Sequence, residues 1–360
     1  MSRFLDKKHE ALKPYTPGEQ PQNVNLIKLN TNENPFPPGP KVIGALSDAE
    51  SSKLNLYPDP EVGVLIKAAS EYYGVPEGMI VAGNGSDELL AFSFMAFSGG
   101  GSVYFPDISY GFYRVYAEVF GASARLIALD DNLMINIEDY YNADGMIVIA
   151  NPNAQTGTAV TRREIERVLK TNENNLVLID EAYVDFGAES SLRLIDEYDN
   201  LLVIQTLSKA RNLAGARVGM AFGSEEIIRD INRIKYSFNP YNLNRLSILA
   251  GAAAIRDREY FDGCIGKIKD TRKKFVEDME GLGFSIVPSL ANFVLAHHDK
   301  ISGEEYYRAL RSRNILVRHF SDERIKDYVR VTIGREDEME ALISATKELL
   351  GKGGIIHEKV

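Results

Sequence analysis

Lys209 lies among groups that could together bind a phosphorylated carbonyl compound. It follows the branched apolar run 201–204, which is typical of a buried parallel strand, so it belongs near the carboxyl end of that strand, where open α/β sheets bind ligands. A desolvated lysine amine can form a Schiff base with a carbonyl group. The hydroxyls of Thr206 and Ser208 and the guanidinium of Arg217 could give a phosphate its donors and its counter-charge. A strand that runs into a basic surface turn is the alternative.

A carboxylate and an amide follow two other apolar runs. Asp180 follows the run 176–179 and could simply cap the next helix. If a pyridine ring lay above the sheet, a buried carboxylate there would keep the ring nitrogen protonated and make the ring a better electron sink. Asn153 follows the run 146–149, where its side chain could bond a ring hydroxyl or only shape a turn.

A glycine-rich turn offers a second anion site. Residues 83–88 follow the run 79–82 and open a helical segment. The backbone amides of Gly85 and Ser86 would be free at the start of that helix, and free amides at helix N-termini bind phosphates. One such turn is a weak signal, but two phosphate-binding turns in one chain indicate a phosphorylated ligand.

The elements that must position these groups form an α/β pattern. Short apolar runs alternate with amphipathic segments between residues 68 and 223, which predicts a mainly parallel sheet flanked by helices. The runs expected as strands are 79–81, 103–105, 126–128, 146–149, 176–179, 201–204 and 219–222.

From about residue 244 the pattern changes to that of an α+β unit. We expect helices at 246–255, 270–282 and 336–350, and strands at 284–287, 292–296, 315–318 and 329–332. The first forty residues are proline-rich and irregular. The chain is therefore predicted to have an N-terminal arm at 1–40 that joins the small domain, a large ligand-binding domain at 41–250 and a small C-terminal domain at 251–360.

Composition and charge exclude several classes of function. The 360-residue chain has 41 Lys and Arg against 51 Asp and Glu, a net charge of −10, so nucleic acids and anionic membranes are not expected as partners. The single cysteine, Cys264, cannot form an internal disulfide, and no apolar run approaches the roughly 20 residues of a membrane helix. The five histidines lack metal-ligand spacing. We therefore expect a cytoplasmic protein without a metal site.

The order and spacing of the strand-end groups resemble those of fold-type-I pyridoxal-phosphate (PLP) aminotransferases and, among them, the histidinol-phosphate aminotransferase family. The resemblance covers nearly the whole chain, from Tyr15 and the run 29–35 to the run 329–334. It implies a PLP-dependent transaminase of histidine biosynthesis (EC 2.6.1.9) that converts L-histidinol phosphate and 2-oxoglutarate to imidazole-acetol phosphate and L-glutamate. The implied partners are these small molecules and a second copy of the chain in a homodimer.

The resemblance also implies roles for individual residues. Lys209 would bind the cofactor covalently, Asp180 would face the ring nitrogen, and Tyr183 would bond the ring hydroxyl. The other residues implied to bind the cofactor are Gly85, Ser86, Thr206, Ser208 and Arg217 at its phosphate, Tyr110 stacked on its ring, and Tyr57 reaching the phosphate of the neighbouring subunit. The role of Tyr57 implies active sites that are shared across the dimer.

Four residues are implied to bind the substrates. Arg330 matches the arginine for the α-carboxylate of glutamate, and Arg318 matches a second cation for the phosphate of histidinol phosphate. Tyr15 would reach the same phosphate from across the dimer, and Asn32 belongs to the matching run 29–35. A plain surface charge is the alternative for each arginine.

One segment departs from the family pattern. The family has asparagine and proline at the positions of Ala154 and Gln155, so the asparagine for the ring hydroxyl is displaced and Asn153 is its nearest substitute. Cofactor motifs do not separate amino donors, so an aromatic amino-acid aminotransferase and a threonine-phosphate decarboxylase of the same fold stay open. A regulator with an aminotransferase-like domain would need a DNA-binding module, and a binding protein without catalysis would not be expected to keep Lys209 and Asp180.

Overall fold

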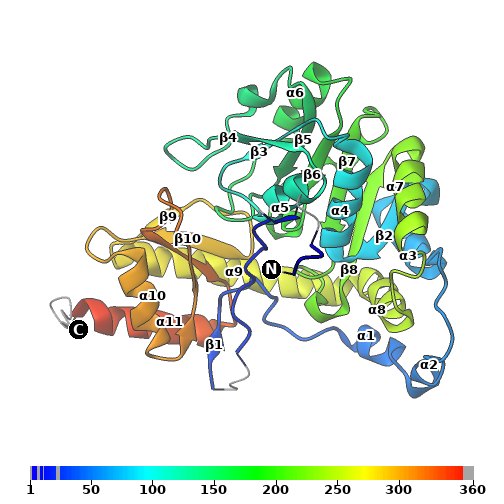
Figure 1. The fold of residues 1–360 in the computed structure, drawn as a ribbon. Coiled ribbons are helices and arrows are strands. Elements are labelled where there is room, and N and C mark those ends of the chain that lie inside the picture. Colours follow the sequence, from blue (N-terminus) through cyan, green and yellow to red (C-terminus); the bar gives the residue numbers. More distant parts are fainter. Residues whose placement is uncertain (1, 6–8, 11, 22–24, 352–360) are drawn as a thin grey trace.

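The computed structural model of the chain describes residues 2–5, 9–10, 12–21 and 25–351 (Figure 1). A seven-stranded sheet lies at the centre of its larger part. In spatial order the strands are β2 (Ile80–Asn84), β8 (Val218–Gly223), β7 (Leu201–Thr206), β6 (Val177–Asp180), β5 (Gly145–Ala150), β3 (Ser102–Pro106) and β4 (Ser123–Ile127). Neighbours are parallel except at β8, which runs antiparallel to β2 and β7. The predicted mainly parallel sheet is thus confirmed, and each predicted apolar run overlaps one strand.

Helices cover both faces of this sheet. They are α3 (Gly63–Tyr73), α4 (Gly85–Phe97), α5 (Phe112–Val119), α6 (Arg162–Thr171), α7 (Glu225–Phe238) and α8 (Arg245–Arg256). In β5, Met146 and Val148 pack in one core with α4, α5 and α7, whereas Ile147 and Ile149 pack in a second core with α3, α6 and α8. Successive side chains of a strand point to opposite faces, so a strand buried on both faces must be apolar throughout.

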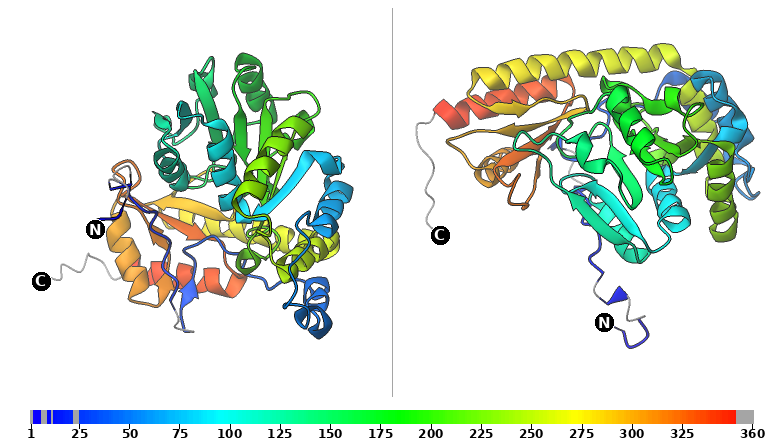
Figure 2. Two further views of the ribbon diagram at one scale, coloured as in Figure 1. Left: turned by 45° about the vertical axis from the view of Figure 1, so that its right-hand side comes forward. Right: turned by 90° about the horizontal axis from the view of Figure 1, so that it is seen from above.

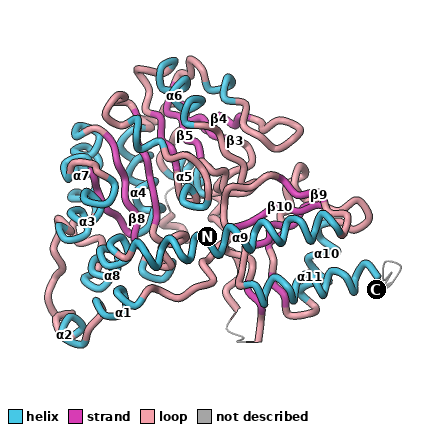
Figure 3. The backbone as a smooth tube through the Cα atoms, turned by 180° about the vertical axis from the view of Figure 1, so that it is seen from behind, coloured by secondary structure: helices cyan, strands magenta, loops and turns pink. Residues whose placement is uncertain are grey.

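A smaller antiparallel sheet forms the centre of the C-terminal part. Its order is β12 (Arg318–His319), β13 (Tyr328–Thr332), β10 (Phe293–His297) and β9 (Ser285–Val287). The helices α9 (Arg258–Gly281), α10 (Gly303–Arg311) and α11 (Glu336–Gly351) pack beside it. The predicted helix 270–282 is the second half of α9, which begins next to α8 and links the two parts of the molecule (Figures 2 and 3). Neither α9 nor any other helix of the described residues is both long and apolar enough to cross a membrane.

The N-terminal arm joins the C-terminal part as a strand. Its β1 (Ile27–Lys28) pairs in parallel with β11 (Ile315–Leu316), and a little further on Asn32 donates its backbone N–H to Thr332 Oγ1 at 3.0 Å. The prediction of one strand over 315–318 is wrong, because β11 bonds the arm whereas the next residues bond β13 as β12. Past the arm, α1 (Pro40–Ala45) and α2 (Asp48–Ser51) lie against α8.

The carboxyl ends of β5, β6 and β7 lie side by side at one edge of the large sheet. Ala150 is the register partner of Asp180, and Asp180 is the partner of Ile204, two residues before the end of β7. Side chains that follow these three strands therefore meet, as open α/β sheets require of their ligand sites.

Candidate active site

Lys209 lies in the turn after β7 and is held by the N-terminal arm. Its Nζ donates to the carbonyl oxygen of Thr31 at 3.2 Å and lies 5.9 Å from the centre of the Tyr183 ring. Asn34 donates to the Lys209 carbonyl oxygen at 3.0 Å, so the arm fixes both the backbone and the amine. A bond to one neutral carbonyl is weak enough for a ligand to replace.

Asp180 is the last residue of β6, and only 4% of its surface is exposed. The Tyr113 hydroxyl donates to Oδ2 at 2.7 Å, and the Ala182 amide donates to Oδ1 at 3.2 Å. Burial raises the pKa of Asp180 to about 6, and these two hydrogen bonds limit the rise. A cation placed beside this carboxyl, such as a protonated ring nitrogen, would stabilise its ionised form.

The five residues predicted at a phosphate come together. Thr206 donates to Ser208 Oγ at 3.0 Å, and Arg217 Nη1 donates to the same oxygen at 3.4 Å. Gly85 has a φ of +78°, and a side-chain carbon built there would overlap with Arg217 Nη2. Ser86 follows in the first turn of α4. The result is a cup of hydroxyls, helix-start amides and one guanidinium, which suits a phosphate group.

Asp87 bonds both Arg217 of this cup and Tyr110, the residue predicted to stack on the ring. Its Oδ2 accepts from Arg217 Nη2 at 2.8 Å, and its Oδ1 accepts from the Tyr110 hydroxyl at 2.6 Å. The predicted ring-stacking residue Tyr110 is thereby tied to the predicted phosphate ligand Arg217. Sequence reasoning did not assign Asp87 this role, although its position next to Ser86 pointed to the cup.

Tyr183 and Asn153, the two residues predicted at a ring hydroxyl, differ in how many of their hydrogen-bonding groups are already used. The Tyr183 hydroxyl accepts from Asn32 Nδ2 at 3.0 Å and can still donate. Asn153 is fully buried, donates to the Ile108 carbonyl oxygen at 2.9 Å and accepts from the Gln155 amide at 2.9 Å. Asn153 thus closes its own turn and keeps one Nδ2 hydrogen for a ligand, while Asn32, predicted for the substrate, orients Tyr183.

Arg318 and Arg330 lie directly opposite each other on β12 and β13. Facing residues of an antiparallel pair project from the same face, and like charges there are destabilising. Arg330 donates to the Ala154 carbonyl oxygen at 2.9 Å and to Gln155 Oε1 at 3.0 Å, and Arg318 donates to the Thr16 carbonyl oxygen at 3.4 Å. These acceptors are neutral, so the two arginines form a cationic pair suited to an anionic ligand.

Tyr15 belongs to the site of its own chain. Its ring stacks on Phe112, with 4.4 Å between the ring centres, and lies 6.0 Å from the Tyr110 ring. Burial raises the pKa of Tyr15, and the nearby charges of Arg330 and Arg318 oppose the rise. Tyr15 therefore lies near the arginine pair of its own chain, whereas the resemblance implied a contribution from across a dimer.

Tyr57 contacts Tyr241 and Arg245, neither of which belongs to the phosphate cup. It is 78% exposed and stacks on Tyr241, with 4.6 Å between the ring centres. Its carbonyl oxygen accepts from Arg245 at 3.3 Å, which fixes the segment while the ring stays open to solvent.

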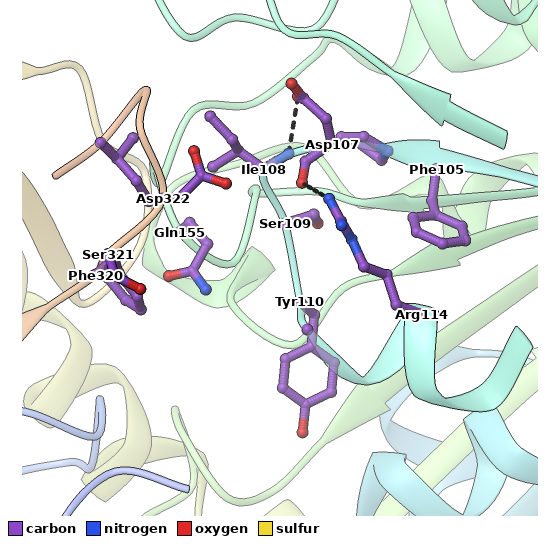
Figure 4. A pocket seen from close by; sticks show the side chains of 13 residues that line it. Phe105, Asp107, Ile108, Ser109, Tyr110, Arg114, Gln155, Phe320, Ser321 and Asp322 are labelled. Carbon is purple, nitrogen blue, oxygen red and sulfur yellow. Dashed lines mark hydrogen bonds between the residues drawn. The ribbon is translucent and has the colours of Figure 1, made fainter. Parts of the chain in front are cut away.

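A pocket of about 240 Å³ opens between the two parts of the molecule, beside these groups. The segment after β3 contributes Ser109, Tyr110 and Arg114, Gln155 comes from the turn after β5, and Phe320 comes from the small part (Figure 4). Gln155 and Phe320 both contact Arg330, so the pocket adjoins the arginine pair and could hold a small polar metabolite.

The residues present fit a phosphorylated pyridine aldehyde. The cup could take the phosphate, since only glycine at position 85 leaves room beside the Arg217 guanidinium, the buried Asp180 could face a protonated ring nitrogen, and the Lys209 amine could bind the aldehyde.

Comparison with known proteins identifies the class of enzyme. Residues 24–345 match the family model for aminotransferase class I and II. The chain is 47% identical over 352 residues to a histidinol-phosphate aminotransferase of Brachyspira hyodysenteriae, covering 97% of this chain and 99% of the relative. It is 46% identical over 353 residues to one of Clostridium botulinum, covering 98% and 100%. The chain belongs to the histidinol-phosphate aminotransferase family, which confirms the resemblance inferred from the sequence.

The fold agrees with this membership. The crystal structure of the histidinol-phosphate aminotransferase from Clostridium acetobutylicum matches with a TM-score of 0.83 at 27% identity, over 91% of this chain and all of that chain.

Besides Asp87, two further residues of the site were not found from the sequence. Tyr113 lies about one helical turn after Tyr110, and a buried tyrosine hydroxyl needs a partner, which is the signal that could have paired it with Asp180. Gln155 was noticed only as a departure from the family pattern, and its contact with Arg330 depends on how the two sheets meet.

Proposed function

We propose that this protein is a PLP-dependent transaminase that moves the amino group of L-histidinol phosphate to 2-oxoglutarate, giving imidazole-acetol phosphate and L-glutamate. The observation that carries the proposal is the facing pair Arg318 and Arg330, whose hydrogen-bond acceptors are neutral. The reaction requires one site to accept two unlike anions, a phosphate on the donor and carboxylates on the acceptor. Two adjacent guanidinium groups meet that requirement. The names of the similar relatives support the same donor.

The cofactor would be held at both ends of its ring. The cup of Gly85, Ser86, Thr206, Ser208 and Arg217 would take its phosphate, and Asp180 its ring nitrogen. Tyr183 would bond the ring hydroxyl, with Asn153 as a second donor, and Tyr110 would cover the ring. When bound, PLP supplies an electron sink for the charge left at the substrate carbon after proton removal.

Lys209 would carry the proton. Its amine, which lies beside the Tyr183 ring, would hold the cofactor and, when not bound to it, would serve as a free base. As that base it would take the proton from the substrate carbon that bears the nitrogen, and as the conjugate acid it would return the proton. The Thr31 carbonyl, which accepts from Nζ at 3.2 Å, would keep the amine in this position.

The two arginines would divide the substrates between them. Arg330 would bind the α-carboxylate of glutamate or 2-oxoglutarate, and Arg318 with Tyr15 would bind the phosphate of histidinol phosphate. Each charge-assisted hydrogen bond contributes about 1.5 to 3 kcal/mol, so histidinol phosphate should exceed histidinol by at least about tenfold to a hundredfold in kcat/KM.

A panel of amino donors with 2-oxoglutarate as acceptor tests the proposal. Histidinol phosphate should be the preferred donor, with histidinol far behind it. Equal use of phenylalanine or tyrosine would favour the aromatic aminotransferase instead, and release of carbon dioxide from threonine phosphate would favour the decarboxylase.

We also propose a homodimer with shared sites, in which Tyr57 reaches the cofactor phosphate of the partner. Support comes from exposed apolar side chains on α1, in the segment 54–57 and at or just after the end of α7, where Tyr57 stacks on Tyr241. These side chains are Ile43, Leu54, Leu56, Tyr57, Phe238 and Tyr241. An exposed surface of this kind marks a site of association.

Mixed dimers test the sharing of sites. Tyr57→Phe should weaken the cup of the partner, and Lys209→Ala should inactivate its own chain. Dimers that combine the two variants should regain part of the activity, because one of the two sites is then intact. Verified mixed dimers without any gain would count against shared sites.

The remaining proposals concern organisation and location. The parallel pairing of β1 with β11 supports an arm at residues 1–40 that belongs with a small domain at 251–360, next to a large domain at 41–250. A cytoplasmic location fits a chain whose single cysteine, Cys264, is buried and reduced. Fractionation of cells that express the chain would test the location.

A further inference from the structure

Gln155 lies where the family pattern has a proline, and it contacts the arginine assigned to the carboxylate. Its Oε1 accepts from Arg330 Nη1 at 3.0 Å, and its backbone amide donates to Asn153 Oδ1 at 2.9 Å. The second bond fixes the turn, so the side chain projects from a rigid backbone position. A proline could form neither bond, because it lacks both an amide hydrogen and a polar side chain.

Arg330 is held in a way that leaves its charge available. Its guanidinium carbon lies 5.0 Å from the centre of the Phe293 ring and 5.3 Å from that of the Phe320 ring. Its two shortest hydrogen bonds go to the neutral oxygens of Ala154 and Gln155. Nε is buried without a partner among the described residues, and burial lowers the pKa of Arg330. A partly buried cation whose hydrogen-bond acceptors are all neutral favours the entry of an anion.

The chemistry of the guanidinium fixes the direction of the Gln155 amide. Arginine has donors and no acceptor, so only Oε1 of Gln155 can face it. The donor end, Nε2, is then turned away from Arg330, and Gln155 lines the pocket of about 240 Å³ (Figure 4). Ser109 lines the same pocket, and its buried hydroxyl has no partner in the described part of the chain. A carboxylate at the edge of the pocket that Gln155 forms would face Nε2 and lie next to Arg330, which Gln155 contacts.

We propose that Gln155 is a positioning residue for carboxylate recognition, which orients the Arg330 guanidinium for the amino acceptor and leaves its charge uncancelled. The inference rests on the proposed function, because it concerns the site for 2-oxoglutarate and glutamate. A neutral amide achieves both effects. A carboxylate of the same shape would hold the guanidinium but neutralise it, and an apolar side chain of similar length would leave the charge but not hold it.

These alternatives define two variants and a control. Gln155→Glu keeps the shape and adds a negative charge, and Gln155→Met keeps the length and removes the hydrogen bond. Gln20→Glu makes the same change of charge at an exposed residue of the arm. The probe is glutarate, a dicarboxylate with neither an amino nor a keto group, titrated calorimetrically into the cofactor-loaded protein at pH 8.

Glutarate affinity should separate the variants by charge. We expect Gln155→Glu to weaken binding at least about 30-fold, Gln155→Met about 3-fold to 10-fold, and Gln20→Glu less than about 2-fold. In steady-state assays KM for 2-oxoglutarate should rise in the same order, with kcat at saturating acceptor nearly unchanged. KM for histidinol phosphate should change at least about five times less, because Arg318 holds the phosphate.

Two results would overturn the proposal. One is glutarate binding by Gln155→Glu within about 3-fold of the wild type, since a cancelled charge must weaken a dianion. The other is an equal loss in Gln155→Glu and Gln155→Met, which would mean that Gln155 only shapes the turn. A wild type that binds glutarate and uses 2-oxoglutarate with a donor other than histidinol phosphate would contradict the proposed donor alone, so the two failures are distinguishable.

Discussion

Replacing Asp180 with asparagine should stabilise the cofactor-free protein while it destroys activity. Asp180 is buried, and burial raises its pKa from 3.8 to about 6. Between these two values the native state holds a proton that the unfolded chain has released. The free energy of unfolding therefore falls as the pH rises from about 4 to about 6, and stays level above that.

The size of the effect follows from the same pKa. Each pKa unit corresponds to about 1.4 kcal/mol, so the ionised carboxylate costs the cofactor-free protein roughly 3 kcal/mol above pH 6. Asparagine resembles the neutral acid and has no such cost. Asp180→Asn should thus be more stable than the wild type by up to roughly 3 kcal/mol at pH 7.5, and the gain should shrink towards pH 4.5.

Urea unfolding of the cofactor-free proteins at several pH values between 4.5 and 7.5 measures this difference, with Asp131→Asn as a control for the loss of an exposed carboxylate. A difference that does not change with pH, or a wild type that is the more stable protein at pH 7.5, would refute the reasoning. Turnover of the loaded enzyme is the second readout. Near-normal turnover of Asp180→Asn would mean that the carboxylate serves only as an acceptor for Tyr113 and Ala182.

Three further outcomes are expected. Lys209→Ala should lower turnover by several orders of magnitude, and borohydride treatment of the wild type should fix the cofactor to Lys209, which mass spectrometry of another labelled lysine would contradict. Gly85→Ala should weaken cofactor binding at least about tenfold in an absorbance titration, because of its left-handed φ and its contact with the guanidinium of the cup, whereas Gly44→Ala, where the added carbon meets open space, should bind normally. Arg318→Ala should raise KM for histidinol phosphate more than KM for glutamate, whereas Arg330→Ala should impair both half-reactions; the reverse pattern would exchange their roles.

The parts of the molecule that were predictable are those set by local pattern. A parallel strand covered on both faces must be apolar along its length, so the run 201–204 predicted β7. The polar residues that follow this run predicted the position of the site. Lys209 and Asp180 could be placed in one site because strand ends share an edge of the sheet. The residue types at those ends then indicated the chemistry.

The parts that were not predictable depend on pairing between distant segments. The facing positions of Arg318 and Arg330 follow from the register of β12 with β13, which no local pattern fixes. The location of Tyr15 depends on the path of the arm, and the bond from Tyr113 to Asp180 joins a helix to a strand 67 residues away. Such contacts are decided by packing and by the need of buried polar groups for partners.

The bond between Asn32 and Thr332 spans 300 residues, so the order of synthesis decides when the substrate side of the site can form. At about 5 to 20 residues per second, a ribosome needs roughly 15 to 60 s to add that length of chain. Only late in this interval have β7 and the cup left the ribosome, and the arm then still lacks β11 and β13. A chain released before β11 and β13 are made would therefore lack the contacts that fix the arm at the substrate side of the site.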